Sequence, residues 1–233
     1  MVALRGKDID SYIARPDPGR PIALIYGADT GLVRERAEAL TAASIADVND
    51  PFALVKLGDE ELSGDGARLV DEAMTVPLFG GRRVLRVRAD PRHFTQSLEV
   101  LIAEPPRDCL VVIEAGSLRP NAALRSLCEK AKTAVVIACY PDTEKDLARL
   151  IESELRDAGL RISRDAHATL VALLGGDRQA SRNEIRKLAL YAHGKGEVTL
   201  DDVIATVSDA SDLALDPIVD ATFAGRPADL ETT

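Results

Sequence analysis

The 233-residue sequence is poor in cysteine and has no excess of positive charge. Its three cysteines, Cys109, Cys128 and Cys139, lie in or beside apolar segments and show no CxxC spacing. This pattern argues against a zinc site and a secreted disulfide framework, and it predicts buried thiols in a reducing cytoplasm. The 29 basic and 38 acidic residues give a net charge of −9. Long-range attraction to nucleic acid or to an anionic membrane is therefore not expected, and any DNA contact must be local or shared with partner chains.

Long apolar runs and clustered histidines are also missing from the sequence. No stretch approaches the roughly 18 apolar residues that a membrane-spanning helix needs, and the amphipathic N-terminal segment does not resemble a signal peptide. His93, His167 and His193 are far apart and have no Cys or Asp at ligand spacing, so we predict no metal site. The expected protein is cytoplasmic, requires no cofactor and does not contact a membrane.

Short apolar runs alternate with helical patterns through the first 140 residues. This order is typical of an α/β fold in which helices cover a parallel sheet, and a chain with 46% hydrophobic residues can bury such a core. The first, fourth and fifth runs are nearly continuous and predict strands buried on both faces, whereas the third alternates with arginines and predicts a strand nearer an edge. The five expected strands cover residues 22–26, 53–57, 84–87, 110–113 and 134–138.

The Pro141-Asp142 step predicts a break, beyond which the pattern is helical. Gly159 is expected to cap the end of a helix, and Ser163 and Thr199 are expected to cap the starts of two others. We therefore expect a five-stranded parallel, P-loop-like α/β domain over residues 1–141, a small all-helical domain over 142–210, and the start of a truncated helical domain over 211–233. The expected helices cover residues 31–45 and 121–131 in the first domain and 144–157, 165–174, 178–193 and 200–207 in the second.

Two of these helices have faces that the pattern assigns to the core. In the helix over 31–45, Leu32, Ala39 and Leu40 are expected to line one buried face. In the helix over 178–193, the run from Leu188 to Leu190 is expected to pack inside the small domain, with the charged residues of 183–187 facing solvent.

The turn after the first strand lies where a P-loop NTPase binds nucleotide. A P-loop needs GxxxxGK[ST], with glycine amides around the phosphates, a lysine near the β and γ phosphates and a hydroxyl on magnesium. Here only three residues separate Gly27 from Gly31, no Lys-Ser/Thr pair follows, and Asp29 brings negative charge into the turn. We interpret Gly27, Asp29 and Gly31 as a degenerate phosphate loop that does not bind ATP, with Asp29 or Thr30 capping the next helix.

No convincing acidic site for magnesium follows the expected strands. A Walker-type site needs an acid, often one of a pair, directly after an apolar strand, yet the third strand carries Arg83, Arg86 and Arg88 and the fourth ends in a lone Glu114 that is not one of a pair. The sequence therefore predicts no ATP hydrolysis and no catalytic residue. A basic cluster of this kind is typical of a solvated sheet edge, with an acidic partner surface or DNA as the alternative contact; its members are Arg82, Arg83, Arg86, Arg88 and Arg92.

The segment between the second and third strands favours apolar side chains at a loop tip. Val76, Leu78 and Phe79 lie beside Pro77 and a pair of glycines, a combination that ends a helix. An adjacent aliphatic and aromatic residue at such a tip can enter a hydrophobic pocket of a partner. From the residues alone, burial of Leu78 and Phe79 under the sheet is an equally open alternative.

Three segments together resemble the delta subunit family of the bacterial DNA polymerase III clamp loader. They are residues 22–27 with the charged residues 34–36, the segment TVPLFGGRRV at 75–84, and the helix NEIRKLALY at 183–191, which Gly176-Asp177-Arg178 introduces. The resemblance covers nearly the whole chain. It implies a degenerate AAA+ module, built from an α/β domain and a helical lid, followed by a helical collar that joins the clamp-loader pentamer.

The resemblance also implies a function and a set of partners. In this family the delta subunit does not hydrolyse ATP; it inserts a hydrophobic Leu-Phe wedge into a pocket of the ring-shaped sliding clamp and helps to open the ring for loading onto primed DNA. Carried over to this sequence, Leu78 and Phe79 form the wedge, and Val76 is the preceding apolar residue. The implied partners are the sliding clamp (beta subunit), the gamma/tau and delta prime subunits through the collar, and primer–template DNA only within the complex.

Two other functions stay open on the sequence. A nucleotide hydrolase or kinase with an atypical phosphate loop would have to bind ATP. A regulatory α/β scaffold with a different partner would keep its partner binding when Leu78 and Phe79 are mutated.

Overall fold

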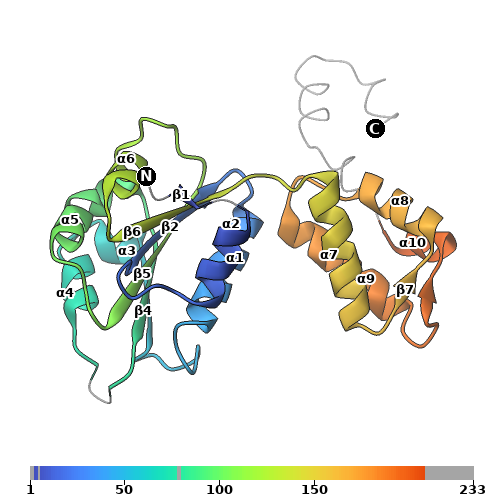
Figure 1. Ribbon diagram of the computed structural model, residues 1–233, viewed down its shortest axis with the longest axis horizontal. Coiled ribbons are helices and arrows are strands. Elements are labelled where there is room, and N and C mark those ends of the chain that lie inside the picture. Colours follow the sequence, from blue (N-terminus) through green and yellow to red (C-terminus); the bar gives the residue numbers. More distant parts are fainter. Residues whose placement is uncertain (1–2, 5, 78–79, 208–233) are drawn as a thin grey trace. The chain divides into compact units, whose positions relative to one another are not determined.

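The computed structural model describes residues 3–4, 6–77 and 80–207, and it divides into two compact units between Tyr140 and Pro141. The first unit is a parallel sheet with helices on both faces (Figure 1). Its strands are β1 (Ala3–Leu4), β2 (Ile22–Gly27), β3 (Leu54–Gly58), β4 (Arg83–Arg88), β5 (Cys109–Ala115) and β6 (Ala134–Cys139). Its helices are α1 (Lys7–Ala14), α2 (Thr30–Ala42), α3 (Asp59–Leu62), α4 (Arg68–Met74), α5 (Pro91–Ala103) and α6 (Ala123–Lys130).

The sheet confirms the five predicted strands and adds a sixth at one edge. The strand order is β1-β6-β2-β5-β4-β3, and every pairing is parallel. As predicted, β4 lies next to an edge strand, β3. The sixth strand was not predicted, because β1 pairs with β6 through only Ala3 and Leu4. Two residues are too few to produce the alternation by which a strand is recognised.

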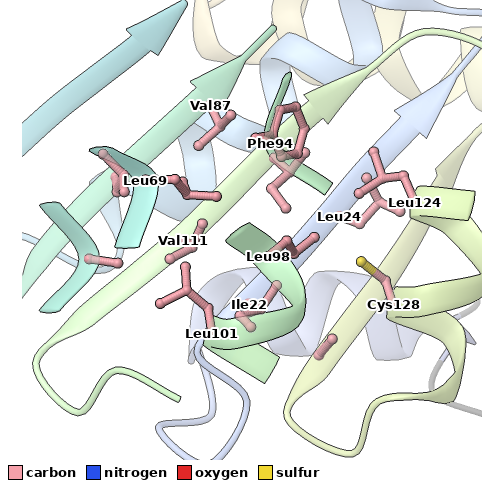
Figure 2. Packing of buried hydrophobic residues seen from close by; sticks show 14 of the residues in the cluster. Ile22, Leu24, Leu69, Val87, Phe94, Leu98, Leu101, Val111, Leu124 and Cys128 are labelled. Atoms are coloured by element: carbon pink, nitrogen blue, oxygen red, sulfur yellow. The ribbon is translucent and has the colours of Figure 1, made fainter. Parts of the chain in front are cut away.

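The central strands send alternate side chains into two separate cores, as the continuous apolar runs predicted. Ile22 and Leu24 of β2 face a core formed with α3, α4, α5 and α6, whereas Ala23 and Ile25 face a second core formed with α1 and α2. Figure 2 shows the first core, in which Phe94 and Leu98 of α5 pack over β2, β4 and β5. The buried face of α2 differs from the prediction, because Ala39 is exposed and the helix instead buries Ala37, one turn after Val33.

All three cysteines are buried and free, which confirms the prediction of buried thiols. Removal from water disfavours a thiolate. Burial therefore raises the pKa of Cys109 to about 11 and that of Cys128 to about 12. Burial also raises the pKa of Cys139. These thiols stay protonated near neutral pH and are poor nucleophiles and metal ligands.

The second unit is helical, with one short pair of strands. The predicted caps are confirmed: Ser163 and Thr199 accept hydrogen bonds from the backbone at two helix starts, and Gly159 has a φ of 73° after a helix end. The expectation of an all-helical unit was wrong, because Arg161–Ile162 pairs in parallel with Glu197–Val198. Strands of two residues carry no detectable period. The elements are α7 (Glu144–Asp157), β7 (Arg161–Ile162), α8 (Arg164–Leu173), α9 (Arg178–Tyr191), β8 (Glu197–Val198) and α10 (Leu200–Thr206).

Helix α9 buries a narrower stripe than the sequence suggested. Ile185 and Leu188 are in the core of this unit, but Leu190 is 78% exposed. The interpretation of Leu190 as a core residue was wrong, because it lies two positions from Leu188, on a different side of a helix with 3.6 residues per turn. The predicted start of a third domain, residues 211–233, lies outside the described residues. Among the helices that the structure describes, none is long and apolar enough to cross a bilayer.

Candidate functional site

The phosphate-loop position begins at Gly27, the last residue of β2. Gly27 lies opposite Cys139 of β6 in the sheet. A Cβ atom at this position would be 1.8 Å from the carbonyl oxygen of Cys139, far closer than non-bonded atoms approach. The close contact between two strands therefore accounts for the glycine, without any need for a bound phosphate.

Asp29 caps α2, which confirms one of the two caps that the sequence predicted. Its Oδ1 accepts a hydrogen bond of 2.7 Å from the backbone N–H of Leu32, and the residue is only 2% exposed. Gly31 is buried inside the first turn of the same helix. The carboxylate therefore sits at the helix start, where a P-loop protein places an anionic phosphate. That this turn does not bind ATP stays a prediction.

The acid after the fourth predicted strand is engaged in an ion pair. Glu114 of β5 accepts hydrogen bonds on one carboxylate oxygen from Nε and Nη2 of Arg86, at 2.8 and 2.6 Å. Both side chains are largely buried. The interpretation of Arg83 and Arg86 as solvated edge residues was therefore wrong, because each is inside the structure and paired with an acid. Arg88, at the end of β4, is exposed as expected.

The segment that follows α4 presents apolar side chains to solvent. Val76 is 73% exposed, and Met74 at the end of the helix is 39% exposed. Leu78 and Phe79 lie outside the described residues, so neither their exposure nor their burial is tested. Gly80 and Gly81 follow with φ values of 71° and 87°, a backbone conformation that residues with a Cβ rarely adopt. The clamp-binding role of Val76, Leu78 and Phe79 stays a prediction.

Arg83 joins the two ends of this segment, which sequence reasoning missed. Its guanidinium donates to the carbonyl oxygens of Glu72 and Thr75 at the end of α4, and to that of Phe52 before β3. It also pairs with the Glu72 carboxylate at 3.0 Å. The only signal in the sequence was an arginine at the first position of an otherwise apolar strand with an acid 11 residues earlier.

An open pocket of about 640 Å³ lies beside the same segment. Its walls come from the chain before β2, from the end of α4, and from the connection between α5 and β5, so it lies near the amino ends of central strands. The phosphate-loop position lies at the carboxyl ends of the strands. The pocket is therefore at the opposite end of the sheet, since all of its strands are parallel. The lining includes Pro18 and Pro21, residues 73–76 and residues 103–108.

Residues 24–140, half of the chain, match the family described as DNA polymerase III, delta subunit. The chain belongs to the DNA polymerase III delta subunit family. It is 25% identical over 186 residues to a protein of Rickettsia prowazekii (strain Madrid E) described as a probable DNA polymerase III subunit delta. That match covers 79% of this chain and 55% of the relative, so the chain spans about half the relative's length.

Solved structures share the fold of this delta family member. The Bacillus subtilis DNA clamp loader delta protein matches with a TM-score of 0.61 at 21% identity, over 97% of this chain and 70% of that one. A Thermotoga maritima RuvB mutant matches with a TM-score of 0.55 at 12% identity, over 85% of this chain and 64% of that one. Domain III of the Thermotoga maritima replication initiation protein DnaA matches with a TM-score of 0.52 at 14% identity, over 86% of this chain and 88% of that one. These likenesses establish the predicted α/β fold.

Proposed function

We propose that this chain is a non-catalytic clamp-loader subunit that binds the sliding clamp through the apolar tip at Val76, Leu78 and Phe79 and helps to open the ring. The observation that carries the proposal is the exposure of Val76 on a segment whose two ends Arg83 holds together. Membership of the delta family supports it. An exposed apolar tip on a fixed base is the kind of feature that fills a pocket on a partner.

Residues at the carboxyl ends of the strands support the non-catalytic part of the proposal. Gly27, Asp29 and Glu114 occupy the positions where a nucleotide site would lie, and each has a structural role there. Glu114 would have to leave Arg86 to bind magnesium. No observation favours the alternative of a nucleotide hydrolase or kinase.

The remaining partners belong to the proposal as well. Residues 1–141 correspond in this account to a degenerate AAA+ α/β domain and 142–210 to its lid, with a collar beginning at 211. The gamma/tau and delta prime subunits would bind through the collar. Primer–template DNA would be contacted only within the assembled loader, since the net charge of −9 gives no general attraction to DNA.

Ring opening requires that the tip prefers one state of the clamp. A ligand shifts an equilibrium only by the difference between its affinities for the two states, so a tip that binds closed and open rings equally opens nothing. We therefore expect the chain to bind a clamp variant with a weakened ring interface at least about 10-fold more tightly than the closed clamp.

Calorimetric titration of both clamps with the 233-residue chain measures this preference. A clamp substituted at a surface far from its ring interface is the control and should bind like the unmodified ring. Equal affinity for the closed and weakened rings would contradict the ring-opening role while leaving clamp binding intact.

A further inference from the structure

Arg83 is a buried arginine at the foot of the exposed segment. It is the first residue of β4 and is only 8% exposed. Its Nη1 donates to the carbonyl oxygen of Glu72 at 2.7 Å and to that of Thr75 at 3.4 Å, and its Nε donates to that of Phe52 at 3.1 Å. Its Nη2 pairs with Oε2 of Glu72 at 3.0 Å. One side chain therefore ties β4 to the end of α4 and to the chain before β3.

These contacts meet a specific need of the helix end. The last four carbonyl groups of a helix have no partner within the helix, and α4 ends at Met74 with no glycine directly after it. The hydroxyl of Thr75 donates a hydrogen bond to the carbonyl oxygen of Asp71 at 2.7 Å, and Arg83 donates to the next carbonyl oxygen, that of Glu72. The end of α4 is thus held by Arg83, which lies directly after the segment 75–82.

We propose that Arg83 and Glu72 form a latch that positions the apolar tip for its partner; this proposal rests on the clamp-binding function proposed above. The latch holds residues 75 and 83 in place, so the seven residues between them start and finish at fixed points. Fixing a loop in its binding geometry lowers the ordering cost of association. When only a fraction of the molecules is competent to bind, the apparent Kd rises by the inverse of that fraction.

A guanidinium is needed for this role, and a plain positive charge is not enough. The planar fork of arginine offers five donors in fixed directions, whereas lysine offers a compact ammonium group. Arg83→Lys can keep an ion pair with Glu72 but cannot reach all of the carbonyl groups of Phe52, Glu72 and Thr75 at once. This variant therefore separates the positioning role from simple neutralisation of Glu72.

The same strand supplies a matched control. Arg86 is three residues further along β4 and forms a similarly buried ion pair with Glu114; among the described residues its polar contacts are with Glu114 and Glu38, not with residues 75–77 or 80–82. Replacement of Arg86 by methionine removes a guanidinium from the same strand and leaves a buried acid unpaired. A general loss of stability should therefore affect both strand variants, and a loss of tip positioning only the Arg83 variants.

The experiment measures two properties of Arg83→Lys, Arg83→Met and Arg86→Met. The first is amide hydrogen exchange in the free chain, at the last turn of α4 and at Gly80, whose N–H donates to the carbonyl oxygen of Pro77 at 3.3 Å. The second is the Kd for the sliding clamp. We expect both Arg83 variants to exchange at least about 10-fold faster at these amides and to bind the clamp about 10-fold more weakly. Arg86→Met should match the wild type in both, after correction for its overall stability.

Each outcome decides a different point. Unchanged exchange in both Arg83 variants would overturn the latch, whether or not the clamp binds. Equal effects of Arg83→Met and Arg86→Met would also overturn it, because the effect would then be general destabilisation. If the wild-type chain does not bind the clamp, the proposed function fails, and hydrogen exchange still decides whether Arg83 fixes the segment.

Discussion

Replacement of both Leu78 and Phe79 by alanine is expected to weaken binding to the sliding clamp by about 100-fold or more, with the fold unchanged. Truncation of a hot-spot side chain in a desolvated pocket costs about 2 kcal/mol or more, and two such losses exceed the affinity that rim contacts can restore. We expect the double variant to fold because of the residues that flank the pair. Val76 is highly exposed, and an added Cβ at Gly80 or Gly81 would meet no heavy atom within 4 Å, so the described residues on either side of the pair are not packed into the core.

The second unit provides a closely matched control for this double variant. Leu190 and Tyr191 are also an adjacent aliphatic and aromatic pair, 78% and 52% exposed on α9. Leu190→Ala/Tyr191→Ala removes the same kind of surface and should leave the clamp Kd within about twofold of the wild type. Calorimetry gives the Kd values, and circular dichroism shows that each variant is folded. Clamp binding by Leu78→Ala/Phe79→Ala at wild-type strength would remove the tip from the interface.

Replacement of Gly27 by alanine is expected to destabilise the protein by about 3 kcal/mol or more. The added Cβ would lie 1.8 Å from the carbonyl oxygen of Cys139. The neighbouring atom belongs to the backbone of a buried strand, so the two central strands β2 and β6 would have to move apart. Overpacking of a tight core typically costs about 1–3 kcal/mol and occasionally more, and a clash with the backbone of a neighbouring interior strand belongs at the upper end.

Gly116 is the control glycine, one residue after the end of β5. A Cβ atom there meets nothing within 4 Å, so Gly116→Ala should change stability by no more than about 0.5 kcal/mol. Urea unfolding followed by circular dichroism suits a chain that has no tryptophan. Equal stability of the Gly27 and Gly116 variants would show that strand packing does not require Gly27 and would reopen its interpretation as a phosphate-loop glycine.

The sequence was most informative where a long, regular pattern exists. The apolar runs of β2, β5 and β6 are buried on both faces and are therefore nearly continuous in sequence. The caps at Asp29 and Thr199 could be read because a short polar side chain before a helical pattern has a specific hydrogen-bonding role. Both signals are local, so no knowledge of tertiary contacts was needed.

What the sequence could not show depends on contacts between distant segments. The pairing of Arg86 with Glu114 joins two strands that are 28 residues apart, and Arg83 reaches the carbonyl group of Phe52 from 31 residues away. The sequence of a strand does not distinguish an arginine in solvent from one that pairs with a buried acid. The short pairs β1–β6 and β7–β8 were missed for another reason, because two-residue strands are set by their partners and not by their own pattern.

The most direct test of the account is to titrate the unmodified 233-residue chain separately with its cognate sliding clamp and with Mg²⁺-ATP. The account predicts saturable, one-to-one binding of the clamp at the Val76–Phe79 tip and no saturable binding of the nucleotide, because Asp29 occupies the start of α2 and Glu114 is paired with Arg86. Saturable ATP binding without clamp binding would contradict the account and favour a nucleotide-dependent function for this fold.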